Sequence, residues 1–312
     1  MKLLKINLTT LLAALLTLIG TQAFAQQEPM YSQYMFNGVS INPAYVGSHE
    51  AVSLSALARR QWTGLEGSPT TETFTIHSPL GKGTGLAGGL NIIHDQIGAT
   101  NRVSVATAFA YQIPLGFGKL SFGVKTGLIN YRTDYSKLTV QNPNDFVYGG
   151  AQVVSEVTPD VGAGVYYYSD KFFAGLSVPS ILNTGSTSSE GISIENIKKH
   201  YFLYSGYVFT LSETLKLKPN VLVKAVEGAP VQLDLNANMY YKDIFGVGLS
   251  YRSLDALALI MQYNISPKLS FGYSYDFVTT TELSQVQYGS HEFVLNYRFS
   301  FDKNILLTPR YF

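Results

Sequence analysis

The chain has 312 residues and a formal net charge of +1; only 14% of its residues are charged, and it contains 22 Tyr and 18 Phe. Soluble domains carry about 25% charged residues, so this composition favours a chain that faces lipid. The balanced charge gives no sign of a nucleic-acid partner. Because cysteine is absent, a disulfide framework, a thiolate metal site and a lipid anchor on cysteine are excluded.

The first 25 residues have the pattern of a secretory signal peptide. Lys2 and Lys5 precede an apolar run from Leu8 to Ile19, and Ala23-Phe24-Ala25 then places small residues where a signal peptidase cuts. The run is shorter than the roughly 20 apolar residues that a membrane-spanning helix needs. We therefore expect residues 1–25 to be removed near Ala25 and the mature chain to be exported.

Residues 26–50 form a leader that fits neither a helix nor a strand. Its stretch Ser32–Ser48, SQYMFNGVSINPAYVGS, is rich in aromatic and amide side chains, and Asn42-Pro43 interrupts any helix there. Aromatic side chains left in water would promote aggregation. We therefore predict that the leader forms a plug or a periplasmic lid for the domain that follows. The candidate plug residues are Tyr31, Gln33, Tyr34, Phe36, Asn42 and Pro43.

Residues 51–312 consist of short segments in which apolar residues alternate with polar or small ones. In the last segment, for example, Phe293 and Leu295 fall on the opposite face from Glu292. Such alternation is typical of membrane strands with an apolar outer face, although the strands of a soluble β-sandwich alternate as well. We predict an all-β fold for residues 51–312, a transmembrane antiparallel β-barrel of about 14 strands. The segments that fit the pattern are 52–62, 70–79, 84–94, 101–113, 119–132, 158–168, 171–178, 199–210, 214–226, 230–241, 244–252, 256–265, 268–278 and 290–301.

The connections between these segments differ in length in a regular way. After the even-numbered segments they are short, whereas after the odd-numbered ones they include the long loops 133–157, 179–198 and 279–289. Outer-membrane barrels have short periplasmic turns and longer extracellular loops, and a sandwich has no reason to sort its loops in this way. The pattern therefore favours a barrel in the outer membrane of a Gram-negative bacterium. Tyr166-Tyr167-Tyr168 and Tyr240-Tyr241 lie near segment ends, where interfacial aromatic belts occur.

The face opposite the apolar one indicates what lines the lumen. Small residues recur there, which leaves space inside the barrel: Ser104, Ala106, Ala108, Ala110, Gly246, Gly248 and Ser250. Charges of both signs also point inward: Lys125, Lys216, Lys218, Lys224, Arg252, Arg298, Asp234, Asp276 and Glu292. Two interpretations remain open, a wall lined with ion pairs and a selective aqueous channel, which more often shows one dominant sign.

No pattern in the chain indicates catalysis, a metal site or a bound cofactor. His94-Asp95 and His291-Glu292 are adjacent pairs, but neighbours in a strand point to opposite faces. We therefore expect that the protein is not an enzyme. Function would then depend on binding, and loops held by a rigid scaffold are suited to it. The candidate partner-binding loop residues are Tyr135, Asp145, Phe146, Tyr148, Ile192 and Ile194.

Several phrases of the sequence resemble one family of membrane proteins. They are YSQYM at Tyr31–Met35, NPAYVG at Asn42–Gly47, RQW at Arg60–Trp62 and PTT at Pro69–Thr71. In these phrases the chain resembles the PorP/SprF family of type IX secretion system outer-membrane proteins. It departs from the family at two positions, with Tyr31 in place of the more usual Phe and Val46 in place of the more usual Ala. The triplet Asn-Pro-Ala also occurs in FadL-like fatty acid transporters, so that triplet alone is weak.

The resemblance implies a function that composition and spacing do not. It implies a barrel that takes part in type IX secretion or gliding motility, together with other secretion components in the periplasm and outer membrane. It also implies a link to a large secreted adhesin at the cell surface. The alternative is a FadL-like or porin-like barrel that takes up small solutes.

Overall fold

The computed structural model describes residues 28–81, 83–137, 153–182, 198–253, 255–280 and 284–300. The expected signal peptide, its cleavage site and five of the six candidate loop residues (Asp145, Phe146, Tyr148, Ile192 and Ile194) lie outside these ranges. Among the described residues, no helix is long and apolar enough to cross a membrane.

The wall of the molecule is a closed antiparallel β-barrel of 14 strands, which confirms the predicted fold. The barrel closes because β1 pairs with β15, from Val52 opposite Phe299 to Arg60 opposite His291. The short segments β8 and β9 both pair with β10, so they form one wall strand that is interrupted at Val208. The strands are β1 (Val52–Arg60), β2 (Thr70–Pro79), β3 (Leu86–Ile97), β4 (Thr100–Leu115), β5 (Gly118–Asp134), β6 (Val153–Ser169), β7 (Phe172–Val178), β8 (His200–Tyr207), β9 (Phe209–Thr210), β10 (Leu215–Val226), β11 (Gln232–Tyr241), β12 (Phe245–Arg252), β13 (Ala256–Asn264), β14 (Leu269–Val278) and β15 (Ser290–Phe299).

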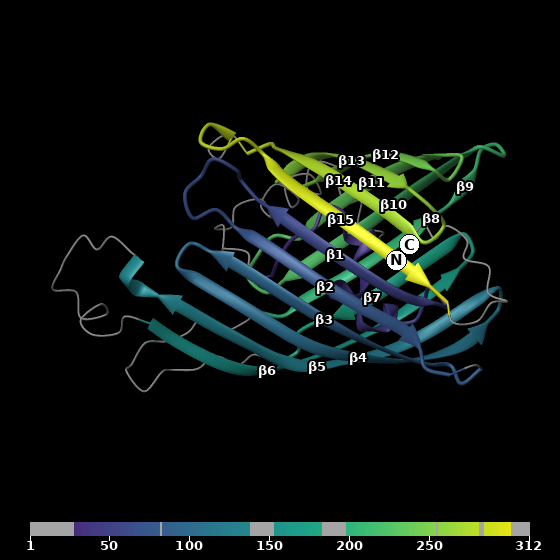
Figure 1. The fold of residues 1–312 in the computed structure, drawn as a ribbon, viewed down its shortest axis with the longest axis horizontal. Helices are drawn as coiled ribbons and strands as arrows, with labels where there is room; N and C mark the ends of the chain where they lie inside the picture. Colours follow the sequence, from purple (N-terminus) through teal and green to yellow (C-terminus); the bar gives the residue numbers. More distant parts are fainter. Residues whose placement is uncertain are drawn as a thin grey trace, which may run out of the picture.

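The two ends of the barrel differ. At one end, called here the short-turn end, the connections are 80–85, 116–117, 170–171, 211–214, 242–244 and 265–268. At the other, the long-loop end, they include 61–69, 135–152, 179–199 and 279–289, although β3 and β4 are joined there by residues 98–99 alone. β5 and β6 extend furthest at the long-loop end (Figure 1). Because β6 starts at Val153, paired with Asp134, the loop before it is shorter than the predicted 133–157.

Side chains alternate between lipid and lumen as the pattern predicts. In β12, Val247 and Leu249 are exposed on the outer face, whereas Gly248 and Ser250 are buried inside. The aromatic runs at segment ends obey the same period of two. Tyr167 and Tyr241 face outward, but Tyr166, Tyr168 and Tyr240 point into the lumen. The expectation that whole aromatic runs form interfacial belts was therefore wrong for these three residues.

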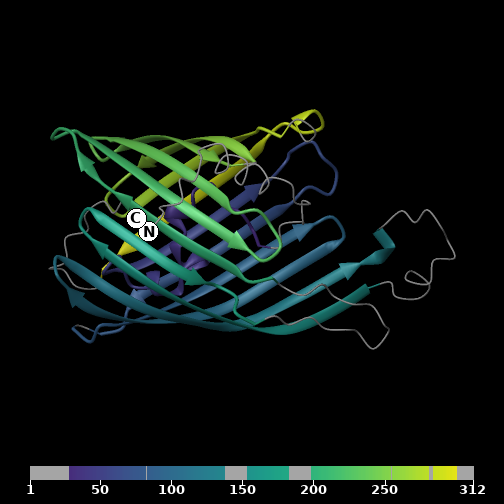
Figure 2. The same cartoon turned by 180° about the vertical axis from the view of Figure 1, so that it is seen from behind.

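The leader lies inside the barrel. It folds into three short turns, η1 (Tyr34–Phe36), α2 (Gly38–Ile41) and η2 (Pro43–Tyr45). Figures 1 and 2 show it as the purple coil enclosed by the ring of strands. Its apolar residues pack against inward side chains of the wall such as Tyr166, Phe173 and Val294. The hydrophobic core of the molecule therefore lies within the lumen, around the leader.

Candidate functional site: the lumen and its leader

The phrase NPAY sets the fold of the leader. Pro43 stands at the first position of η2, where its fixed φ suits a helical turn and its missing N–H is not needed. The side-chain oxygen of Asn42 caps this turn by accepting a hydrogen bond from the Ala44 amide at 2.9 Å. The Asn42 amide group in turn donates to the Val165 carbonyl oxygen of β6 at 3.0 Å. Asn42 thus joins the turn to the wall.

The leader runs along the lumen from the long-loop end to the short-turn end. Glu28 binds Arg102 at 2.9 Å, and Arg102 is the third residue of β4, close to the long-loop end. Glu50 binds Lys119 at 2.7 Å, and Lys119 is the second residue of β5, at the short-turn end. Glu28 and Glu50 therefore bind the wall at opposite ends of the lumen.

The ion pair of Glu28 is tight enough to change its ionisation. Burial raises the pKa of this carboxyl, but the charge and the hydrogen bond of Arg102 outweigh burial and lower the pKa to about 2. Glu28 is therefore charged at neutral pH and fixes the beginning of the described leader to β4.

Glu292 of β15 holds the next part of the leader. One of its carboxylate oxygens accepts the backbone N–H of Ser32 at 2.9 Å, and the other accepts that of Gln33 at 2.7 Å. Arg59 of β1 donates to the same carboxylate at 3.1 Å. The Glu292 side chain is fully buried, and hydrogen bonds to a buried charged group are among the stronger ones in proteins.

Asp276 and Arg252 complete this arrangement. Asp276 accepts from the Ser32 hydroxyl at 2.6 Å and from Arg59 at 2.7 Å. Arg252, which pairs with Asp234 at 3.1 Å, donates to the Tyr31 carbonyl oxygen, also at 3.1 Å. We call this group the latch, because it fixes the leader by backbone as well as by side-chain contacts. Its members are Ser32, Gln33, Arg59, Arg252, Asp276 and Glu292.

The middle of the leader makes polar contacts with the wall, and glycines in the wall allow it to approach closely. The Tyr34 hydroxyl donates to Asn220 of β10 at 2.7 Å. Gly123 and Gly164 lie where the leader touches β5 and β6: a Cβ at Gly123 would collide with the Ala44 backbone, and one at Gly164 with the Asn42 amide oxygen. The small residues of the lumen thus provide room for the leader itself.

The remaining sequence-predicted residues have clear positions. The half-buried Phe36 ring lies 5.3 Å from the ammonium group of Lys218, a cation–π contact. Tyr135 lies at the long-loop end, half-buried in a short turn, η3 (Tyr135–Lys137). The inward small residues are all buried. The inward charged residues are buried or half-buried, and several of them form ion pairs, such as Lys125 with Asp160 at 2.6 Å.

The sequence analysis did not identify Arg59, although this residue shares the inward face of its strand with Ser53 and Ser55.

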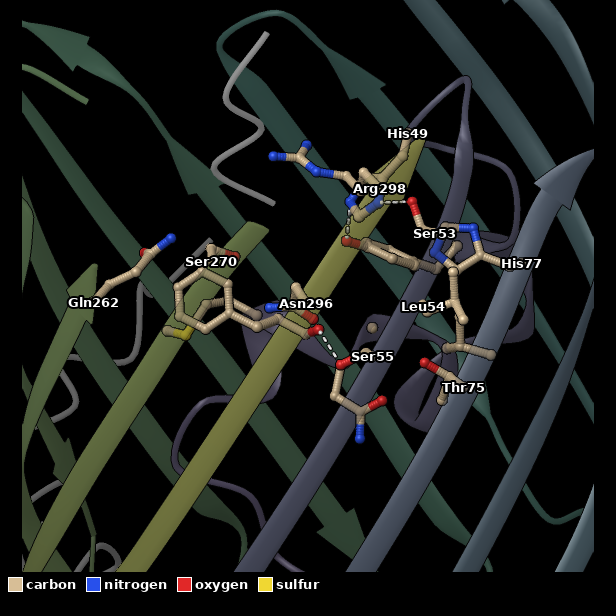
Figure 3. A pocket seen from close by; sticks show the side chains of 16 residues that line it. His49, Ser53, Leu54, Ser55, Thr75, His77, Gln262, Ser270, Asn296 and Arg298 are labelled. Atoms are coloured by element: carbon tan, nitrogen blue, oxygen red, sulfur yellow. Dashed lines mark hydrogen bonds between the residues drawn. The ribbon is translucent and has the colours of Figure 1, made fainter. Parts of the chain in front are cut away.

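Three small cavities lie between the leader and the described part of the wall, and the smallest, of about 10 Å³, lies beside Tyr34, Tyr45 and Tyr204. The first, at the short-turn end, has a volume of about 30 Å³ and is shown in Figure 3. The second lies towards the long-loop end, beside Tyr31, Lys224 and Asp234, and has a volume of about 40 Å³. Since one water molecule needs about 10–15 Å³ of such space, each cavity has room for only a few water molecules.

Two imidazoles line the first cavity, which we call the short-turn pocket. His49 bridges two hydroxyls, with its Nδ1 2.7 Å from Ser53 Oγ and its Nε2 2.9 Å from the Tyr45 hydroxyl. His77 Nδ1 accepts the backbone N–H of Gly47 at 3.1 Å. The two rings are 5.1 Å apart. Within the described residues, no group of three or more His, Asp or Glu side chains could hold a metal ion.

Among solved structures, outer-membrane barrels resemble this fold. The Ralstonia pickettii toluene transporter TbuX matches with a TM-score of 0.51 and 10% identity, over 85% of this chain and 93% of that chain. A Pseudomonas aeruginosa FadL homologue has a TM-score of 0.46 and 11% identity, over 88% and 95% of the two chains. At such identities the likeness to TbuX shows the fold alone. No curated protein matches the sequence.

The family comparison extends over most of the chain. The family model of the type IX secretion system membrane protein PorP/SprF matches residues 23–297. This range includes the leader, the wall strands β1 to β14 and most of β15. The phrases that resembled this family, SQYM and NPAYVG, form the turns that occupy the lumen. The chain therefore belongs to the PorP/SprF family and is an outer-membrane β-barrel of a type IX secretion system.

Proposed function

We propose that the protein is a non-enzymatic component of the type IX secretion and gliding machinery, which helps to export a large cell-surface protein or to hold it at the surface. The observation that supports this role is the family match, because it covers both the barrel wall and the leader inside it. The partners would be other secretion components in the periplasm and outer membrane and a secreted adhesin.

A chromosomal deletion tests this role. Cell-surface and culture-medium proteins of the deletion strain would be compared with those of the parent and of a complemented strain. We expect one or a few large surface proteins to be lost and to return on complementation. An unchanged set of surface proteins, together with slower growth on a small apolar solute, would contradict the proposal.

Uptake of small solutes is the alternative, since TbuX is a toluene transporter with the same type of fold. Its likeness to this chain concerns the fold only. The cavities beside the leader have volumes of about 10, 30 and 40 Å³, whereas a cavity that takes up benzene measures about 150 Å³. Passage of a solute along the lumen would therefore require movement of the leader.

We also propose that the leader closes the barrel. The support is its position along the lumen, the burial of every residue from Met30 to Val39 except the half-buried Phe36, and its bonds to the wall at both ends. Deleting Gln27–Val39 should convert a closed barrel into a conducting one in planar bilayers. A synthetic peptide with the deleted sequence serves as the matched control and should reduce the conductance again. An unchanged conductance after the deletion would mean that other groups block the lumen and that the leader is better explained as a docking segment.

Finally, we infer that the long-loop end faces the outside of the cell. The chain has no cysteine, so single cysteines can report accessibility. Cysteines at Ser136 and Ser284, both exposed at the long-loop end, should react with a membrane-impermeant maleimide in intact cells. A cysteine at Ser212, exposed at the short-turn end, should react only after the outer membrane is opened. The reverse pattern would invert the orientation.

A further inference from the structure

A hollow lies on the outer, lipid-facing side of the wall, across β4 to β7. Its rim consists of outward side chains such as Phe109, Phe122 and Leu176, all of which are exposed. Ala163 of β6 stands between two valines, Val124 of β5 and Val178 of β7, and its methyl group leaves the space that a larger side chain would fill. We propose that this hollow, called here the outer groove, is a binding site for one acyl chain of a phospholipid.

The size of the outer groove fits one such chain. Its volume is about 570 Å³, nearly four times the roughly 150 Å³ of a cavity that takes up benzene. Scaled from the six carbon atoms of benzene, the groove has room for about 20 carbon atoms. That is one acyl chain rather than two.

The lining of the outer groove suits hydrocarbon. None of the described residues that line it is Asp, Glu, Lys or Arg. One of its two side-chain hydroxyls, that of Ser177, is already used, because it donates to the Ile41 carbonyl oxygen inside the barrel at 2.8 Å. The groove is continuous with the lipid-facing surface of the wall, so its occupant comes from the membrane.

The outer groove lies in one leaflet. Val124 is the seventh residue of β5 and Ala163 the seventh from the end of β6, both counted from the short-turn end. At about 3.4 Å per residue and a tilt of about 35–45°, seven residues span about 17–19 Å along the membrane normal. Half of a hydrocarbon core is about 15 Å thick. With the orientation proposed above, this is the periplasmic leaflet, which in the outer membrane consists of phospholipid.

The leader touches the same stretch of wall from the inside. Gly123 and Gly164, which line the groove, have no side chain to separate it from the turn at Asn42–Ala44. Asn42 also donates to the Val165 carbonyl oxygen, and the Val165 side chain lines the groove. The backbone around the groove is therefore fixed before a lipid arrives. A preformed site loses less free energy on binding than one that must first be ordered, which distinguishes the groove from the rest of the lipid-facing surface.

Photocrosslinking with a labelled lipid tests the site. The mature protein would be placed in nanodiscs, one barrel in each, with a small fraction of a phospholipid that carries a diazirine in one acyl chain. We expect adducts to concentrate on Phe109, Val124 and Leu176 and to level off at a single lipid for each barrel. Val247 and Leu249, which are equally exposed on β12, serve as the internal reference. Adducts spread evenly over both regions, without saturation, would overturn the proposal.

Matched alanine variants locate the binding. Ala163→Phe fills the groove and should reduce its adducts by about tenfold or more, since overpacking by even 1.4 kcal/mol is a factor of ten. Ala237→Phe makes the same change at an exposed outward position of β11 and should leave them unchanged. Heat-modifiable migration in gels shows whether each variant folds. If folded Ala163→Phe is labelled in the groove as the parent is, the proposal is wrong.

The other possible occupant is a protein. A photoreactive amino acid in place of Val124, irradiated in intact outer membranes, separates the two cases because a lipid adduct adds a small mass and a protein adduct forms a larger band on a gel. We expect the lipid adduct. A crosslink to a second copy of the chain or to another protein in its place would overturn the proposal. The cysteine labelling described above tests the orientation separately, so an inverted barrel would change the leaflet but not the groove.

Discussion

Replacing Glu292 by alanine should release the first part of the leader from the lumen. The Glu292 carboxylate accepts hydrogen bonds from the Ser32 amide at 2.9 Å, the Gln33 amide at 2.7 Å and Arg59 at 3.1 Å. Removing one partner of a buried ion pair costs about 3–5 kcal/mol, because the other groups remain buried without their counter-charge. Since about 1.4 kcal/mol is a factor of ten, the equilibrium between seated and released leader should shift by roughly 100-fold to several thousand-fold.

A cysteine at Ser40 reports this release, because Ser40 is half-buried in the middle of the leader. In proteoliposomes, Glu292→Ala should raise its rate of reaction with maleimide and should increase the conductance of the barrel. Asp160→Ala is the matched control, since the buried Asp160 binds Lys125 of the wall at 2.6 Å and is not part of the latch. Parent-like labelling and conductance in Glu292→Ala would refute the idea that the latch holds the leader. Equal effects of both variants would indicate a general loosening of the wall.

Two further predictions concern the fit and the charge of the leader. Gly164→Ala should displace the Asn42 side chain and destabilise the seated leader by about 1–3 kcal/mol. A cysteine in the leader should then react faster with maleimide. Gly88→Ala is the control, because its new methyl group meets only the flexible Leu80 side chain and should leave the labelling rate unchanged. Because the pKa of Glu28 is lowered from 4.5 to about 2, its ion pair stabilises the folded state above pH 4.5, and this contribution is lost as the pH falls towards 2. The difference in Tm between the parent and Glu28→Gln should therefore be present at pH 6 and vanish in this acid range, whereas a constant difference would contradict the assignment.

The sequence by itself determined the wall of the barrel. The face on which a strand residue lies is a local property, because side chains alternate with period two whatever the strand pairs with. For this reason the strand number, the inward position of Lys125 and Glu292 and the difference between the two ends could be predicted. The turn at Asn42-Pro43 was also local, since Pro restricts its own φ and the residue before it.

Only the tertiary structure decided which inward groups meet. Ser32 and Glu292 are 260 positions apart in the chain, and their contact depends on the closure of β15 onto β1 and on how deep the leader lies. The same holds for His77 and Arg298, which line one pocket from different strands. A period of two distinguishes inside from outside but carries no information about height along the barrel or about neighbours across it. Register, closure and the path of the leader fix those, and they arise only when all the strands pair.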